Sequence, residues 1–417
     1  MEEEYDLVII GAGIAGLYTA FRVLGESPKT RFIVLEADDG PGGRIQTVDF
    51  AGSEVVCGAG IGRTTDVLMR RLVRDMGLET GKPFPFHVNY SPVLETLDLK
   101  QAIRRLRRAY QGQKGQTERT FKQFATPVLG GPQEYQKLVN TVGYHDFDEE
   151  DVYDLLYNYG LDTFQDRKLM RMPWRALVAQ LLKHANQGQK RVHFGQQVLA
   201  IKTDEKGQKK NEAKVVHILC KKHHSEYSIR AQKVVVATAI HSIRRLIQGS
   251  AEHLYRSVEG QPFMRVYGQF TKPAADAMRD VVTRQTLVPG DIQKVIPWDP
   301  DTGVYMISYC DSAAATRLHK KTKNTPENRQ YFCRELERGL DLVPHTLHLK
   351  QIRAFYWPEG THCYTPIPGG ESVARYIHRI QRPVTNVYVV GEAVSDNHGW
   401  CEGALNSVET VIAEIIK

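Results

Sequence analysis

Three glycines near the N-terminus have the spacing that binds the phosphates of a dinucleotide. Gly11, Gly13 and Gly16 follow the apolar run Leu7–Ile10, which is typical of a buried parallel strand, and they open a segment with helical spacing. The first glycine permits a tight turn, the second lets the backbone approach a pyrophosphate, and the third lets the helix pack against the strand. The first helical turn, which includes Ala15, then points unpaired N–H groups at the pyrophosphate.

An acidic residue stands where such a fold binds ribose. Glu36 ends the second predicted strand, 31–35, about 20 residues after the glycines, where a carboxylate accepts a hydrogen bond from a ribose 2′-hydroxyl. Neither neighbour of Glu36 is Arg or Lys, which argues against a 2′-phosphate and therefore against NADP. The glycines alone would be weak evidence, but the strand, the helix and the acid together predict a dinucleotide site.

The next motif completes a resemblance to a known family. Gly43 can bring the backbone close to a ligand, and Arg44 can neutralise phosphate charge. With the preceding motifs, they resemble the FAD-binding N-terminus of the flavin-dependent amine oxidase superfamily. That superfamily includes monoamine and polyamine oxidases, L-amino-acid oxidases and more distant phytoene and protoporphyrinogen dehydrogenases. The resemblance implies that Gly43 and Arg44 lie along the FAD diphosphate and flavin edge.

A second glycine-rich segment, 54–61, does not form a second dinucleotide site. Arg63 stands where the third glycine would be needed for close helix packing, which argues against enzymes that bind FAD and NADPH on separate folds. The resemblance implies instead that this segment runs beside the flavin ring and that a later strand contacts the adenine. The implied residues are Gly58, Ala59, Ile61 and, at the adenine, Val198.

The C-terminal region carries the second strong motif. A predicted buried strand, 387–390, ends at Gly391 and Glu392, and the sequence Glu402-Gly403-Ala404 opens a last helix. The resemblance implies that Glu392 reaches the ribityl or diphosphate part of FAD. The N-terminus of the last helix would face the flavin and stabilise the negative charge that builds on reduction.

Three residues are candidates for catalysis and substrate binding. Tyr364 and Trp400 match two aromatic positions that flank the substrate amine in monoamine-oxidase-like sites, although core packing is the alternative for both. Arg265 stands where many of these enzymes have a lysine that holds a water near flavin N5. Because an arginine stays protonated, Arg265 could hold the water, pair with an acid or bind a substrate carboxylate.

Other residues near these motifs could take part. Cys363 matches the position at which monoamine oxidases attach FAD covalently, but most of the superfamily binds FAD without such a bond, so we expect non-covalent binding. His362 and His398 flank the same loops and could exchange protons, or could be ordinary core residues.

Two further clusters have an ordinary interpretation and a functional one. The acids between residues 146 and 151 suit a helix N-terminus, or they attract the distal ammonium of a polyamine. The arginines of 104–108 form the solvated face of a helix, or they bind an anionic partner. His223 and His224 lack a third ligand at a plausible spacing, so we predict no metal site.

The chain of 417 residues is long enough for two domains. We predict an α/β fold, in which a Rossmann-like FAD/NAD(P)-binding domain carries an inserted mixed α+β substrate domain. Residues 1–80, 190–245 and 380–417 form the first domain, and residues 81–189 and 246–379 form the second. Predicted elements include a helix over 174–185, a hairpin over 215–229, a separate strand over 233–238 and a strand over 261–270.

Composition limits partners and location. The net charge of +7 is too small, over a chain of this size, to indicate nucleic-acid binding. The six cysteines contain no C-x-x-C pair and favour a reducing compartment. The chain starts without the features of a signal peptide and has no apolar run of membrane-spanning length, so we expect a cytoplasmic protein.

We therefore expect an FAD-dependent oxidoreductase that oxidises a monoamine or polyamine. A hydride passes from the carbon next to the nitrogen to flavin N5, and O₂ reoxidises the flavin to yield H₂O₂. One alternative is another flavoenzyme on the same scaffold, such as an L-amino-acid oxidase, a desaturase or a sugar mutase. The other is a non-catalytic flavin-binding protein that interacts through the 104–108 helix.

Overall fold

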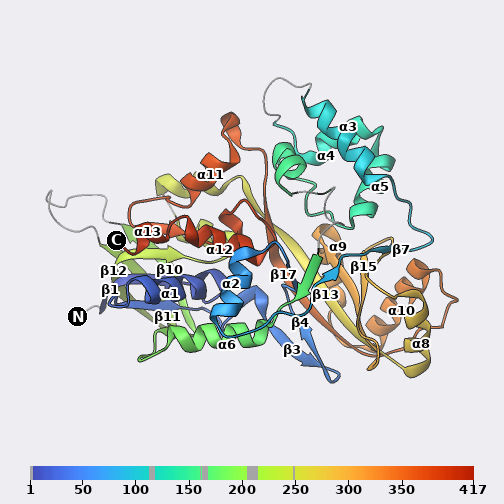
Figure 1. The fold of residues 1–417 in the computed structure, drawn as a ribbon, viewed down its shortest axis with the longest axis horizontal. Helices are drawn as coiled ribbons and strands as arrows, with labels where there is room; N and C mark the ends of the chain where they lie inside the picture. The colour runs from blue at the N-terminus through green and yellow to red at the C-terminus, as the bar shows by residue number, and fades with distance from the viewer. Residues whose placement is uncertain (1–2, 112–117, 160, 162–167, 204–214, 248) are drawn as a thin grey trace.

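The computed structural model describes residues 3–111, 118–159, 161, 168–203, 215–247 and 249–417. A seven-stranded sheet lies on the side of the molecule that holds both termini (Figure 1). Its order is β10-β11-β12-β1-β2-β9, and β18 pairs with β12. The pairs among β18, β12, β1, β2 and β9 are parallel, whereas β10, β11 and β12 are antiparallel. The bounds are β1 (Glu3–Ile10), β2 (Phe32–Leu35), β9 (Val192–His193), β10 (Gln196–Thr203), β11 (Val216–Lys222), β12 (Ser225–Val236) and β18 (Val387–Val389).

Helices cover both faces of this sheet. Because alternate residues of a strand point to opposite faces, Leu7 and Ile9 of β1 pack into one core and Val8 and Ile10 into another. The first core is covered by α1 (Ile14–Glu26), α2 (Val67–Asp75), α6 (Trp174–Ala185), α12 (Cys401–Glu409) and α13 (Ile412–Ile415). The second is covered by α7 (Ile240–Leu246) and α11 (Val373–Ile380).

A second sheet and a helical lobe form the other side of the molecule (Figure 1). The sheet has the order β17 (Leu349–Tyr364), β13 (Val258–Phe270), β16 (Val304–Asp311), β15 (Lys294–Asp299), β14 (Thr286–Leu287) and β7 (Asn89–Tyr90). Its own core includes α8 (Lys272–Val281), α9 (Ser312–Leu318) and α10 (Pro326–Leu340). The lobe consists of α3 (Leu99–Gln111), α4 (Phe121–Leu129), α5 (Pro132–Val142) and the π-helical segment Asp154–Tyr159.

Short strands connect these parts. The hairpin of β3 (Thr47–Phe50) and β4 (Ser53–Val56) lies below the junction of the two halves (Figure 1). A three-stranded sheet has the order β5 (Ile61–Arg63), β8 (Lys168–Arg171) and β6 (Phe84–Pro85).

The predicted α/β class is confirmed, and several predicted elements need correction. The segments predicted as a hairpin arm at 227–229 and a separate strand at 233–238 are one strand, β12, because its backbone partners in β11 and β1 continue through the polar residues between them. The predicted last helix is two helices, α12 and α13. Helix α6 falls inside the predicted insertion but packs against α1 of the first sheet. No helix in the described ranges is long and apolar enough to cross a membrane.

Candidate cofactor and substrate site

A cavity of about 1130 Å³ begins at the glycine turn after β1 and ends among side chains of the second sheet and the helical lobe. Most of the predicted site residues lie on its wall, although they come from distant parts of the chain. These are Gly11, Gly13, Ala15, Glu36, Gly43, Arg44, Gly58, Ala59, Ile61, Val198, Arg265, Gly391, Glu392, Trp400 and Ala404.

The glycine turn has the geometry that phosphate binding requires. Gly11 has a φ of +103°, and a Cβ on Gly16 would lie 1.9 Å from the carbonyl oxygen of Gly11, so both positions exclude larger residues. A Cβ on Gly13 would meet nothing within 4 Å and would project into open space beside the helix end. No side chain caps the N-terminus of α1, so its N–H groups are available to an anion. These residues therefore fit the pyrophosphate of a dinucleotide.

Glu36 lies on the cavity wall beside the glycine turn, where backbone N–H groups hold its carboxylate in place. Its carboxylate accepts hydrogen bonds from the N–H of Ala12 at 2.6 Å and of Asp38 at 2.9 Å. Burial raises the pKa of Glu36, while these N–H groups oppose the rise. The carboxylate lines the cavity beside the glycine turn, where the sequence predicts a ribose contact.

Glu392 is the centre of a buried ion network. Its carboxylate accepts hydrogen bonds from the Nη1 of Arg44 at 3.0 Å, from the backbone N–H of His362 at 2.9 Å and from that of Gly399 at 2.9 Å. The Nδ1 of His362 lies 2.8 Å from the same carboxylate. Burial alone would raise the pKa of Glu392, but His362 and Arg44 hold it well below the ordinary value. Glu392 is therefore ionised at neutral pH and joins the segments of Arg44, His362 and Gly399.

Three predicted cofactor residues support the wall from behind. Gly16 packs against Gly11, as described above. The Glu402 carboxylate accepts hydrogen bonds from the backbone N–H groups of Leu68 and Met69 at 2.9 and 2.8 Å, so it caps α2 and does not line the cavity. A Cβ on Gly403 would lie 2.2 Å from the carbonyl oxygen of Asn397, so this glycine permits close packing of α12.

Tyr364 is not part of an aromatic pair at the cavity, which corrects the prediction. It is fully buried, its hydroxyl donates to the carbonyl of Ser395 at 3.0 Å, and its ring packs edge-on against Tyr376. Because adjacent side chains of a strand point to opposite sides and Cys363 lines the cavity, Tyr364 faces the core. The sequence resemblance identified the strand that borders the cavity, but it did not show which of its side chains face the cavity and which face the core.

Trp400 does line the cavity, with other aromatic residues that the sequence did not identify. The guanidinium of Arg63 lies 4.1 Å from the Trp400 ring centre and covers one side of the indole. Trp357 lies on the wall with its Nε1 donating to the carbonyl of Cys57 at 2.8 Å. Phe263, Tyr144 and Tyr309 also line this end. Phe263 and Trp357 are partners in the β13–β17 pairing, a contact that no local sequence pattern signals.

Arg265 is buried at the same end. Its guanidinium lies 4.4 Å from the Tyr309 ring centre and borders Gly60. Burial would lower the pKa of Arg265, but Tyr309 and Tyr267 raise it, so the guanidinium remains charged. None of the ion pairs in the described residues includes Arg265. A buried cation without such a partner is suited to an anionic group of a ligand.

The acidic run divides into cavity residues and structural residues. Asp146 and Glu150 line the cavity. Asp148 instead pairs with Lys122 at 2.9 Å, and Asp151 accepts hydrogen bonds from the backbone of Tyr153 and Asp154. Burial raises the pKa of Glu150 well above the ordinary value, and Asp154 adds to the effect. The cavity therefore has a carboxyl-bearing wall whose charge a bound cation would stabilise.

A buried lysine behind this wall was also not predicted from the sequence. Lys294 is fully buried, donates to the carbonyl of Gly143 and lies 3.8 Å from Asp311. Its ammonium lies 3.4 Å from the Tyr144 ring centre. Burial lowers its pKa to about 8, while Asp311 and Asp146 oppose the fall. An isolated lysine in a strand carries no signal of burial, because lysines are ordinarily exposed.

Comparison with known proteins decides the family. A family model described as flavin containing amine oxidoreductase matches residues 14–416. The chain belongs to this family. Membership confirms the resemblance found in the sequence, and it implies a flavin cofactor. The uncapped helix end and the open space at Gly13 fit that group.

Solved structures agree with the fold of this flavin amine oxidoreductase. Wild-type putrescine oxidase bound to putrescine has a TM-score of 0.73 and 16% identity, and 99% of each chain is covered. A double mutant from a redesign of that enzyme's cofactor binding has a TM-score of 0.71, with the same identity and coverage. At this identity the likeness shows the fold alone. No curated protein matches the sequence.

Proposed function

We propose that this flavin-containing oxidoreductase is an FAD-dependent oxidase of an amine. The observation that carries the proposal is that one cavity joins a dinucleotide cradle to an end lined by carboxyl groups and aromatic rings. FAD, when bound, would accept a hydride at N5 from the carbon next to the nitrogen and react with O₂ to yield H₂O₂. The chain's own residues bind the cofactor, orient the amine and exclude water.

The cofactor residues divide by the part of FAD they would hold. The N-terminus of α1 with Gly11 and Gly13 would hold the pyrophosphate, and Glu36 the ribose. We propose that the flavin is not attached through Cys363. Burial raises the pKa of that thiol well above its ordinary value, which keeps it from forming the reactive thiolate.

The acidic wall supports a cationic amine as substrate. Asp146 and Glu150 would attract an ammonium group, while Trp357 and Trp400 would contact the alkyl chain. The proposal is tested by O₂ consumption and H₂O₂ formation with primary alkylamines, diamines of matched length and L-amino acids. We expect turnover of amines, with diamines favoured over monoamines in kcat/KM by about tenfold, which corresponds to one additional charge-assisted contact. Absence of H₂O₂ with every amine would contradict the proposal.

An amino-acid substrate is the second candidate, and Arg265 is the observation that favours it. A substrate carboxylate would pair with this buried guanidinium. If the substrate is an amino acid, Arg265→Gln should reduce kcat/KM by about 100-fold, because a charge-assisted contact of about 3 kcal/mol is lost. If the substrate is an amine without a carboxylate, the same variant should change kcat/KM for that amine by less than about tenfold.

Two further features concern the basic helix over 104–108 and the cellular compartment. Arg107, in the middle of the basic helix, donates to the carbonyl of Leu156 at 2.7 Å, so at least one of its arginines serves packing. All six cysteines are unpaired, which supports our proposal of a reducing compartment such as the cytoplasm.

A further inference from the structure

We infer that His398 is the residue that takes the proton from the substrate ammonium before the amine is oxidised. The inference rests on the proposed amine oxidase function. An alkylammonium has a pKa near that of lysine, about 10.4, so nearly all of the amine reaches the site protonated at neutral pH. A protonated nitrogen has no lone pair with which to support loss of a hydride from the neighbouring carbon. A group that accepts this proton inside the cavity would allow the abundant ammonium form to bind and react.

Arg265 cannot be that group. It occupies the position at which a lysine was expected from sequence resemblance, and its guanidinium remains protonated. His362 also does not suit the role, because both of its ring nitrogens are engaged. Nδ1 lies 2.8 Å from Glu392, and Nε2 accepts a hydrogen bond from the backbone N–H of Ile240 at 3.3 Å. The wall also includes His87 and His241, which are exposed, so His398 is the remaining buried histidine of the cavity.

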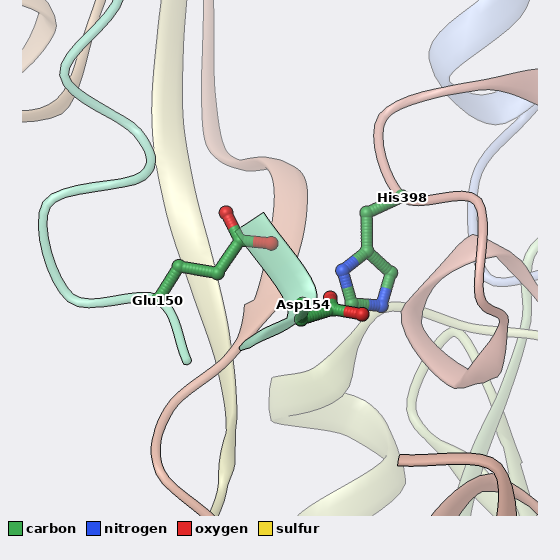
Figure 2. A group of neighbouring side chains, drawn as sticks. All are labelled: Glu150, Asp154 and His398. Carbon is green, nitrogen blue, oxygen red and sulfur yellow. The ribbon is translucent and has the colours of Figure 1, made fainter. Parts of the chain in front are cut away.

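The surroundings of His398 suit a proton acceptor. The side chain is 7% exposed, and its Nε2 has no hydrogen-bond partner within the described part of the chain. A ring nitrogen of His398 and carboxyl oxygens of Glu150 and Asp154 lie within 4.8 Å of one another. Figure 2 shows the imidazole turned toward both carboxyl groups. An imidazolium formed here would be stabilised by Asp154 and Glu392, which both act to raise the pKa of the ring.

A second, smaller cavity offers the proton a way out. It has a volume of about 50 Å³ and is polar, which is enough room for water. Glu150, Tyr159, His398 and Trp400 line both this cavity and the large one, so they form the wall between the two. The small cavity is also lined by the exposed Asp396. His398 thus lies between the amine chamber and a water-sized space that leads toward the surface.

The charge state of His398 agrees with this role. Burial lowers its pKa below the ordinary 6.5, so the ring is neutral at neutral pH and free to accept a proton. Asp154 and Glu392 oppose this fall, whereas the neighbouring His362 adds to it. The other groups that face the ring are Glu150 and Asp396, with Arg63 across the small cavity and the uncharged ring of Tyr364 at 4.2 Å.

The transfer is a balanced proton exchange. The N–H bond of the ammonium breaks, an N–H bond forms on the imidazole, and the free amine keeps the electron pair. The imidazolium then returns the proton to water in the small cavity. No electrons are exchanged in this step, and the two-electron oxidation that follows belongs to the proposed function.

The test is the pH dependence of the limiting rate of anaerobic flavin reduction at saturating amine, in the flavin-loaded enzyme. The wild type should be constant from pH 7 to 10, with a fall only below pH 6.5 as His398 becomes protonated. His398→Gln should be about 10³-fold slower at pH 7.5, should gain about tenfold per pH unit, and should approach the wild type near pH 10.5, where the amine itself loses its proton. His319→Gln, an exposed histidine outside the cavity, is the matched control and should follow the wild type.

Glu150→Gln separates His398 from the carboxyl beside it. If His398 accepts the proton, Glu150→Gln leaves the imidazole in place, so both the acid limb and the plateau remain. The inference is overturned if the rate of flavin reduction in Glu150→Gln rises toward pH 10.5 while His398→Gln keeps the pH profile of the wild type. Glu150 would then be the proton acceptor. The inference is also overturned if Mn²⁺ or EDTA shifts the fall in the wild-type rate below pH 6.5. Glu150, Asp154 and His398 would then hold a metal cation.

The flavin spectrum of each variant shows that it is folded and loaded. Failure of the wild-type flavin to be reduced by any amine would refute the proposed function, and the proton transfer with it. Reduction of the wild type together with an unchanged pH profile in His398→Gln would refute the proton transfer alone.

Discussion

Gly16→Ala is expected to abolish flavin binding. A Cβ at this position would lie 1.9 Å from the carbonyl oxygen of Gly11 and 3.1 Å from its carbonyl carbon, so α1 and the turn cannot keep their close approach. The end of α1, which we propose to hold the phosphates, would move away from the glycine turn. We expect the molar ratio of flavin to protein, measured by absorbance near 450 nm after gel filtration, to fall from about one to below about 0.1.

Gly25 provides the matched control because it belongs to the same helix. A Cβ there would meet nothing within 4 Å. Gly25→Ala should retain the flavin and raise stability by about 0.5–1 kcal/mol, since alanine loses less conformational freedom than glycine in a helix. Full flavin occupancy in Gly16→Ala would contradict the geometry of the glycine turn.

Glu392→Gln is expected to be the most destabilising single change in the wall. The variant keeps an acceptor for the backbone N–H groups of His362 and Gly399 but removes the charge that faces Arg44. Because the Arg44 side chain is 30% exposed, loss of its charge-assisted contact with the buried carboxylate should cost about 1.5–3 kcal/mol. Chemical denaturation of the purified protein at pH 7 measures this difference in the free energy of unfolding.

The difference in stability between the wild type and Glu392→Gln should become smaller as the solution is made more acidic. The pKa of Glu392 lies well below its ordinary 4.5 in the folded protein, so its contribution is complete above pH 4.5. As the pH falls through the folded pKa the contribution is lost, and the gap between wild type and variant should narrow below pH 4.5. The control is Glu54→Gln, whose ion pair with Arg175 is about half exposed and should contribute about 1 kcal/mol or less. Equal losses in the two variants would refute the buried network.

The residues of the proposed cofactor site could be predicted to lie together because their signals are local. The glycine spacing, the strand before it and Glu36 lie within one short stretch, and the structure places them on one wall. The amphipathic helix over 174–185 coincides with α6 for the same reason, since a 3.6-residue period is visible without any partner.

The substrate half could be predicted only in part, because it is made by long-range contacts. Phe263 meets Trp357 through strand pairing, and Glu402 binds the backbone of α2 from the far end of the chain. Tyr364 shows a second limit. A shift of one residue along a strand moves a side chain to the other face, so a motif match does not determine whether a residue faces the cavity or the core.

The most direct measurement is the visible spectrum of the purified protein during anaerobic addition of amines. We expect a yellow, flavin-loaded protein that one class of amine bleaches and that recovers its colour when O₂ is admitted, with formation of H₂O₂. A colourless protein that FAD does not reconstitute would contradict the cofactor site, and a yellow protein that no amine bleaches would contradict the proposed amine oxidation.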